Sequence, residues 1–129
     1  MKSFALILTA ALTATAAQAN AKTCKARAIP YEVEKARLTF EFSDDLRSAT
    51  LSSNAGSTQI IGQGEICGQP TSADCTTSDQ SSSGVLKAVT ECKQSDSRAM
   101  IVFSTVNQNG RAECKVGRTR MIFDFFECN

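Results

Sequence analysis

Apolar and polar residues alternate with a period of two along much of the chain. Leu38, Phe40 and Phe42 are each separated by one polar residue, which is the period of a half-buried β-strand. A turn centred on residues 44–45 places Phe40 opposite Ala49 and keeps the apolar side chains on one face. The pattern therefore predicts a hairpin over residues 35–53.

The stretch 98–128 reads as three further antiparallel strands. Asn-Gly at residues 109–110 predicts a type I′ turn, which places Phe103 opposite Val116. Side chains alternate between the two faces of a strand, so one face is expected to be buried and to carry Ile101, Phe103, Ala112, Cys114, Val116, Met121, Phe123 and Phe125.

A second turn in this stretch, Gly-Arg at residues 117–118, fits type II′. It places Ala112 opposite Phe123, on the same buried face. The other face is expected to be solvated, although it sets Lys115 opposite Arg120, a like-charge pair that disfavours the register.

Shorter strands are expected elsewhere. Residues 26–33 suggest an edge strand, because Pro30 cannot donate to a ladder. Residues 57–61 and 85–92 suggest two more, and a turn at 95–96 pairs the latter with 99–104, placing Thr90 opposite Ile101. We therefore predict an all-β, antiparallel fold of about eight short strands in consecutive hairpins, either a small up-and-down barrel or a two-sheet sandwich, stapled by disulfides.

Residues 68–84 interrupt the alternation. Eight of the 13 residues from Thr71 to Ser83 are Ser or Thr, and no large apolar residue occurs between Ile66 and Val85. Such a segment buries too little to order itself, so a long Ser/Thr-rich loop is expected. It is also where the chain has room to cross to a second sheet.

The first 19 residues have the form of a secretory signal peptide. Lys2 precedes an apolar run that ends in Ala17-Gln18-Ala19, a small-residue cleavage site. The expected mature protein is a single domain over residues 20–129, secreted or periplasmic, with no membrane association after cleavage. Without Lys2 it has 13 basic and 13 acidic residues.

All six cysteines lie in the expected mature part: Cys24, Cys67, Cys75, Cys92, Cys114 and Cys128. An even number in a small exported domain predicts three disulfides. Cys67–Cys75 is the favoured pair, because it closes a short loop. Cys114 and Cys128 are not expected to pair, because the predicted register puts them on opposite faces. The chain has neither a Cys-x-x-Cys motif nor histidine, so no metal site is expected.

Candidate catalytic chemistry is sparse. Without histidine, Ser-His-Asp and Cys-His arrangements are excluded. Asp44 and Asp45 are better explained as turn residues, and Glu32 and Glu34 as a solvated strand face. We expect no cofactor, and a neutral chain without a basic patch argues against nucleic acid.

The segment Ser81-Ser82-Ser83-Gly84-Val85-Leu86-Lys87 resembles the Ser-Gly-rich loop of small periplasmic inhibitors of c-type lysozymes. Members of that family are exported β-barrels, whose loop enters the enzyme cleft. The resemblance covers about seven residues and departs from the family pattern at Ser82, where the family has a second glycine, and at Lys87, where it has an aromatic residue. A flexible Ser-rich linker explains the same composition.

Three hypotheses of function follow. The first is an exported protein-binding module, in its most specific form an enzyme inhibitor, with another protein as partner and the loop residues Ser81, Ser82, Ser83, Gly84 and Lys87 as contacts. The second is a small-molecule carrier whose barrel interior is lined by Phe40, Phe42, Phe103, Phe123 and Phe125. The third is a carboxylate-based enzyme. The sequence leaves the oligomeric state open.

Overall fold

The computed structural model describes residues 21–29, 37–71 and 74–129. This part of the chain forms 11 antiparallel strands in one sheet. The strands are β1 (Ala21–Ile29), β2 (Leu38–Ser43), β3 (Ala49–Ser53), β4 (Gly56–Gly62), β5 (Glu65–Ile66), β6 (Gln69–Pro70), β7 (Cys75–Asp79), β8 (Val85–Cys92), β9 (Ser97–Ser104), β10 (Asn109–Val116) and β11 (Thr119–Phe126). The signal peptide predicted for residues 1–19, Pro30, Glu32 and Glu34 lie outside the described residues.

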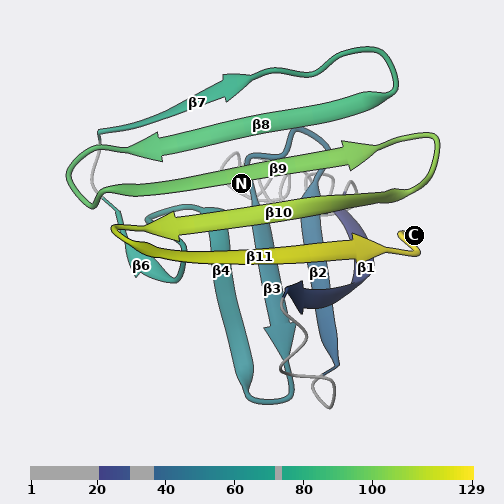
Figure 1. Ribbon diagram of the computed structural model, residues 1–129, viewed down its shortest axis with the longest axis horizontal. Helices are drawn as coiled ribbons and strands as arrows, with labels where there is room; N and C mark the ends of the chain where they lie inside the picture. The colour runs from purple at the N-terminus through teal and green to yellow at the C-terminus, as the bar shows by residue number, and fades with distance from the viewer. Residues whose placement is uncertain (1–20, 30–36, 72–73) are drawn as a thin grey trace, which may run out of the picture.

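The sheet is an up-and-down meander. Its first and last strands, β1 and β11, pair with each other, whereas β6 and β7, in the middle of the sequence, form its two edges. Its order is β6-β5-β4-β3-β2-β1-β11-β10-β9-β8-β7. Every strand pairs with its sequence neighbour except β6 and β7, so the break falls at residues 71–74, inside the segment where a crossing was predicted. The sheet curls into a half-barrel, and Figure 1 shows β7 to β11 crossing β2 to β4. The all-β, disulfide-stapled prediction is confirmed.

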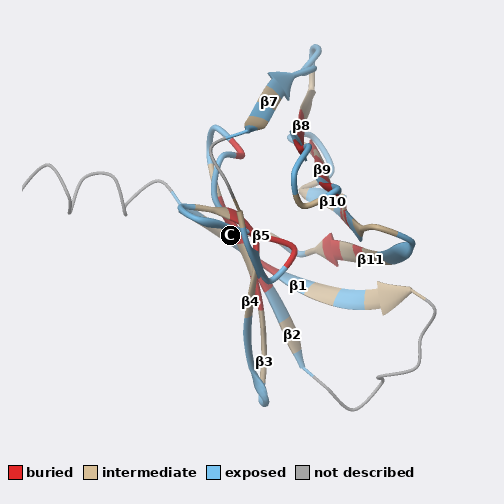
Figure 2. Ribbon diagram, turned by 90° about the vertical axis from the view of Figure 1, so that its left-hand side faces the viewer, coloured by how far each residue is buried: buried red, intermediate tan, exposed pale blue. Residues whose placement is uncertain are grey.

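The core lies between the two halves of the curled sheet, where the buried segments of Figure 2 face each other. Four phenylalanines at most 1% exposed form its centre, and neighbouring ring centroids lie 4.5–6.2 Å apart. They are Phe40, Phe42, Phe103 and Phe125. The predicted face of the C-terminal strands is thus the buried one, with Val116 and Met121 at its half-buried margin.

The register of the β10–β11 hairpin is confirmed, with Ala112 opposite Phe123 and Gly117 at φ 56. The like-charge pair Lys115–Arg120 is also present. Arg120 turns away from it and forms two hydrogen bonds with Glu113, at 2.9 and 3.0 Å. The bonded carboxylate raises the pKa of Arg120. A neighbouring acid thus removes the objection to this register.

The predicted turn at residues 109–110 is wrong. The loop lies at 105–108, and Phe103 pairs with Gly110 rather than with Val116. Gly110 is instead a strand residue, whose missing side chain leaves room for the Phe125 ring; a Cβ there would lie 2.5 Å from a ring carbon. In a strand, glycine often marks such a close approach.

Two other hairpins differ from prediction by a shift of two residues. Phe40 pairs with Leu51, and Thr90 pairs with Ala99. A longer loop replaces the predicted two-residue turn in both, with five residues between β2 and β3 and four between β8 and β9. A left-handed residue lies in each loop: Leu46 at φ 57 and Asp96 at φ 47. Because each shift is an even number of residues, the buried face is preserved.

The prediction that residues 26–33 form an edge strand of the sheet is wrong. β1 lies inside the sheet, between β2 and β11, with Cys24 buried. The described part of this strand ends at Ile29. The N- and C-terminal strands therefore meet in the middle of the sheet order.

The three disulfides join Cys24 to Cys128, Cys67 to Cys114 and Cys75 to Cys92. Three disulfides are thus confirmed, as is the absence of a Cys114–Cys128 bond, and such bonds fit an oxidising compartment. The predicted Cys67–Cys75 pair is wrong.

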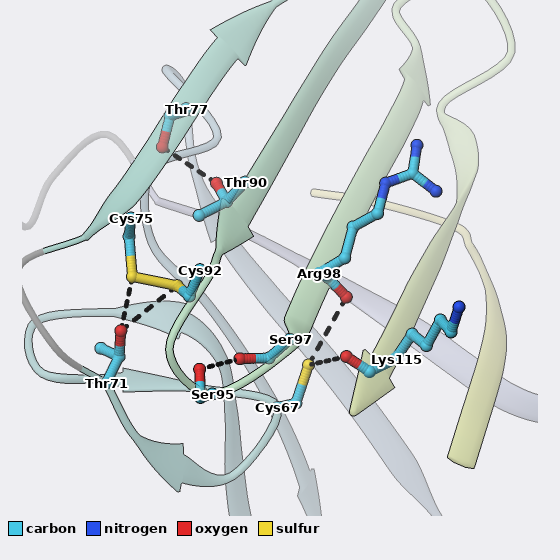
Figure 3. Close-up of a disulfide and its surroundings, with 10 residues drawn as sticks. All are labelled: Cys67, Thr71, Cys75, Thr77, Thr90, Cys92, Ser95, Ser97, Arg98 and Lys115. Atoms are coloured by element: carbon cyan, nitrogen blue, oxygen red, sulfur yellow. Dashed lines mark hydrogen bonds between the residues drawn. A yellow bond between two sulfur atoms is a disulfide. The ribbon is translucent and has the colours of Figure 1, made fainter. Parts of the chain in front are cut away.

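Proximity in sequence misled the prediction because these two cysteines belong to different strands on opposite sides of the break. Cys67 follows β5, and its sulfur lies 3.6 Å and 3.7 Å from the carbonyl oxygens of Arg98 and Lys115 (Figure 3). Cys75 begins β7, directly opposite Cys92.

Cys128 is also placed differently from expectation. Strand alternation put it on the outer face, but Glu127 adopts a left-handed φ of 51° and breaks the alternation after β11. Cys128 thereby packs against the core and bonds Cys24, beside a pair of backbone hydrogen bonds between Thr23 and Asn129.

Candidate functional site

The Ser/Thr-rich segment 68–84 is only partly a loop. It contains β6 and β7, and β7 is tied to β8 by a disulfide. The connection from β7 to β8 forms one end of the sheet, and Figure 1 shows the β9–β10 connection at the same end. We define the tip as residues 80–84 and 105–108.

The first half of the tip is held by Ser81. Its Oγ accepts a 3.0 Å hydrogen bond from the backbone N–H of Lys87, and its own N–H donates to Oδ1 of Asp79 at 3.0 Å. This side-chain pairing replaces a backbone rung at the end of β7. Hydrogen bonds from the side chain and from the backbone N–H of Ser81 lower the pKa of Asp79. Ser81 and Lys87, both predicted contacts, therefore support the hairpin.

Beyond Ser81 the chain reverses in a tight turn. The backbone groups of Ser82 and Val85 exchange hydrogen bonds of 2.9 and 3.1 Å. Gly84 adopts φ 77, which a side chain would disfavour. Ser82 and Ser83 are exposed on this turn. Of the five predicted contacts, Ser81 is exposed too, but Ser82 and Ser83 lie on the turn itself.

The second half of the tip is joined to the first through Gly84, whose carbonyl oxygen accepts hydrogen bonds from the N–H and the hydroxyl of Thr105, at 3.0 and 3.2 Å. The loop is braced internally, because Gln108 Nε2 donates to the Thr105 carbonyl at 2.7 Å. Val106 is 80% exposed at its apex. The two connections therefore form one continuous surface.

The tip residues outside the predicted set are Thr105, Val106, Asn107 and Gln108. Sequence reasoning missed them because the Asn-Gly pair at 109–110 was assigned to the turn. The signal was present in the polar run from Asn107 to Asn109, which interrupts the alternation directly after β9.

The tip is uncharged: it carries hydroxyls, amides, one glycine and one exposed valine. Serine, glycine and asparagine are typical of surfaces that adapt their hydrogen bonds to a protein partner. A single apolar side chain within a polar rim supplies area for burial. The tip therefore offers hydrogen-bonding groups and one apolar side chain, and none of its side chains is charged.

The alternative sites fit less well. The phenylalanines proposed to line a carrier pocket pack against one another, with Phe40 and Phe125 stacked at 4.5 Å between centroids. Asp45 accepts hydrogen bonds from the Ser43 hydroxyl at 2.7 Å and the Arg47 N–H at 3.1 Å, so its carboxylate serves the turn. These bonds lower the pKa of Asp45.

Among the described residues, no cluster of three or more His, Cys, Asp or Glu side chains is arranged to hold a metal ion. In the same part of the chain no helix has the length and apolarity needed to cross a membrane. Comparison with protein-family models, with curated proteins and with solved structures finds no match.

Proposed function

We propose that this chain is an exported protein-binding module that contacts another protein through the tip. The observation that carries the proposal is the junction of two hydrogen-bonded turns at Gly84, which presents exposed Val106 beside Ser82 and Ser83. Rigid turns lose little conformational entropy on binding. The three disulfides support export, because such bonds persist in oxidising compartments.

The most specific form of the proposal is an inhibitor of an extracellular or periplasmic enzyme. It draws on the resemblance of residues 81–87 to the inhibitor loop and on the placement of Ser82 and Ser83 at a protruding turn. A c-type lysozyme is the first enzyme to assay, with cell-wall lysis as the readout. Unchanged lysis at saturating protein would remove this specific form and leave the broader one.

The broader form is tested by capture from native secretions with the mature chain as bait. Val106→Arg changes the tip at an exposed site, so folding should be unaffected. Asn54→Arg, in the exposed β3–β4 turn, is the matched control. We expect wild type and Asn54→Arg to capture the same protein, and Val106→Arg to bind it at least about tenfold more weakly. Equal binding by all three would overturn the proposal.

A further inference from the structure

Within the described residues, β6 and β7 are the two edge strands of the half-barrel, and the two edges differ in their protection. β6 is two residues long and contains Pro70, a combination that blocks strand addition. β7 has five residues, Cys75-Thr76-Thr77-Ser78-Asp79, without lysine or proline. β6 thus carries two of the devices that blunt an edge, a short length and a proline, whereas β7 carries one, the charged Asp79 at its end.

β7 is also held rigidly. The Cys75–Cys92 disulfide fixes one end, and the hydroxyls of Thr77 and Thr90 are hydrogen-bonded at 3.0 Å in its middle, as Figure 3 shows. The Asp79–Ser81 bond fixes the other end. A strand that is ordered in advance spends little entropy in pairing with a partner.

The hydrogen-bond pattern shows which backbone groups face outward. Gln80 N–H donates to Lys87 O at 2.8 Å. In an antiparallel ladder, bonded pairs alternate with non-bonded pairs, so the even-numbered residues of β7 bond β8. The N–H and C=O groups of Thr77 and Asp79 therefore point away from β8, toward the break in the sheet.

Two hollows lie between the layers along β7. One, of about 260 Å³, is partly apolar and includes Ile61, Ile66 and the Cys75–Cys92 disulfide in its lining. The other, of about 200 Å³, lies near the far end of β7. Thr77 borders both hollows, so side chains of an added strand that face inward would meet one and then the other.

The second hollow is acidic on balance. Three carboxylates border it, Asp44, Asp45 and Asp79, against the cations Arg47 and Lys87. Hydrogen bonds from Ser43 and Ser81 lower the pKa of Asp45 and of Asp79 respectively, which keeps both ionised near neutral pH. A basic side chain is therefore favoured beside Asp79, and an apolar one beside the disulfide.

We propose that β7 accepts an extended segment of another protein as an added antiparallel strand, with a basic side chain near Asp79 and an apolar side chain beside Cys75–Cys92. A second copy of this chain fits less well. The inward side chains of β7 are Thr77, Asp79 and a bridged cysteine, so self-pairing brings neither a basic nor a large apolar group to the hollows. This inference does not depend on the tip.

The test uses the mature chain and a short capped peptide in which every second residue is threonine. The residues between the threonines are, in order, lysine, valine and valine. Backbone amide NMR shifts report its binding. We expect the shifts to concentrate in β7 and along the two hollows, and a peptide with glutamate in place of lysine to bind at least about tenfold more weakly. Asp79→Asn, which keeps an acceptor for Ser81, should weaken the lysine peptide by about threefold, as expected for an exposed ion pair.

Two variants separate the possible outcomes. Thr77→Pro removes an outward N–H and the hydroxyl bond to Thr90, but no backbone hydrogen bond to β8, so it should abolish peptide binding while the fold is retained; Thr77→Val, which loses only the hydroxyl bond, is the matched control and should keep peptide binding. Val106→Arg, at the tip, should leave peptide binding unchanged, which separates this site from the proposed function. Binding that survives Thr77→Pro, or no shift at any accessible peptide concentration, would overturn the inference. A dimer that Thr77→Pro dissociates would replace the partner strand with a second copy.

Discussion

Removing the Cys67–Cys114 disulfide is expected to destabilise the protein more than removing Cys75–Cys92. The three bridges are nested in the sequence: Cys75–Cys92 lies inside the loop closed by Cys67–Cys114, which lies inside the loop closed by Cys24–Cys128. An intact inner bridge therefore shortens the loop that the next bridge closes. With Cys75–Cys92 intact, the loop closed by Cys67–Cys114 has an effective length of 30 residues, eight from Cys67 to Cys75 and 22 from Cys92 to Cys114. The chain-entropy relation then gives about 3.6 kcal/mol for the middle bridge and about 3.1 kcal/mol for the inner bridge, whose separation is 17.

Burial widens this gap. Cys114 is fully buried and Cys67 is 6% exposed, whereas Cys75 is only half-buried. Each sulfur lost from the core costs about 1 kcal/mol, comparable to a buried methylene. The middle bridge loses two buried sulfurs and the inner bridge one, which adds about 1 kcal/mol to the entropy difference of about 0.5 kcal/mol. Cys67→Ala/Cys114→Ala should therefore be about 1.5 kcal/mol less stable than Cys75→Ala/Cys92→Ala.

Guanidinium chloride unfolding of both double variants and wild type, with linear extrapolation, measures this difference. Losses of this size approach the whole stability of a small domain. A protecting osmolyte at one fixed concentration therefore keeps all three proteins folded at the start. Equal losses, or a larger loss for the inner pair, would refute the reasoning that the layers are held together mainly by the middle bridge.

Two further predictions concern single residues. Gly110→Ala should cost more than about 2 kcal/mol in thermal unfolding, because its Cβ would lie 2.0 Å from the backbone oxygen of Val102. Gly62→Ala, whose Cβ would meet the movable end of a glutamine side chain, should cost far less; similar losses would contradict the packing. Because the folded-state pKa of Asp45 is lowered from 3.8, its stabilisation is present above that value and lost as pH falls through the folded pKa. Asp45→Asn should therefore be less stable than wild type at neutral pH, by under about 1 kcal/mol, and equal to it at strongly acidic pH; a constant difference would exclude the ionised form as the cause.

The sequence predicted which segments form strands and which of their side chains face the core, because the alternation of apolar and polar residues indicates both. Leu38 to Phe42 alternates strictly, and in Met121 to Phe125 only Ile122 departs from the alternation; Phe40, Phe42, Phe123 and Phe125 are buried as expected. The loops were not readable to the residue. Each of these hairpin loops contains a left-handed residue, such as Leu46 or Gln108, for which composition gives no signal.

The disulfides were unreadable for a different reason. Loop-closure entropy favours near partners in the unfolded chain, but the native pairs follow the sheet order, which is non-local. Cys24 and Cys128 are 104 residues apart, yet they meet because β1 and β11 are neighbours. Ser82 and Ser83 of the tip were proposed as contacts from the sequence, whereas the position of Val106 beside this segment depends on the pairing of β8 with β9.

One disulfide, Cys75–Cys92, helps to hold in place the part of the sheet that carries both proposed surfaces. β7 contains no fully buried side chain, so packing in the core does little to hold it. Its order comes instead from Cys75–Cys92 and from bonds made by Thr77 and Ser81. Because β7 and the tip contribute so little apolar burial, their exposed residues are free to change with the partner at small cost to stability. The two proposed binding surfaces and the buried core thus lie in different parts of the molecule, and the Cys75–Cys92 disulfide joins β7 to the core strand β8.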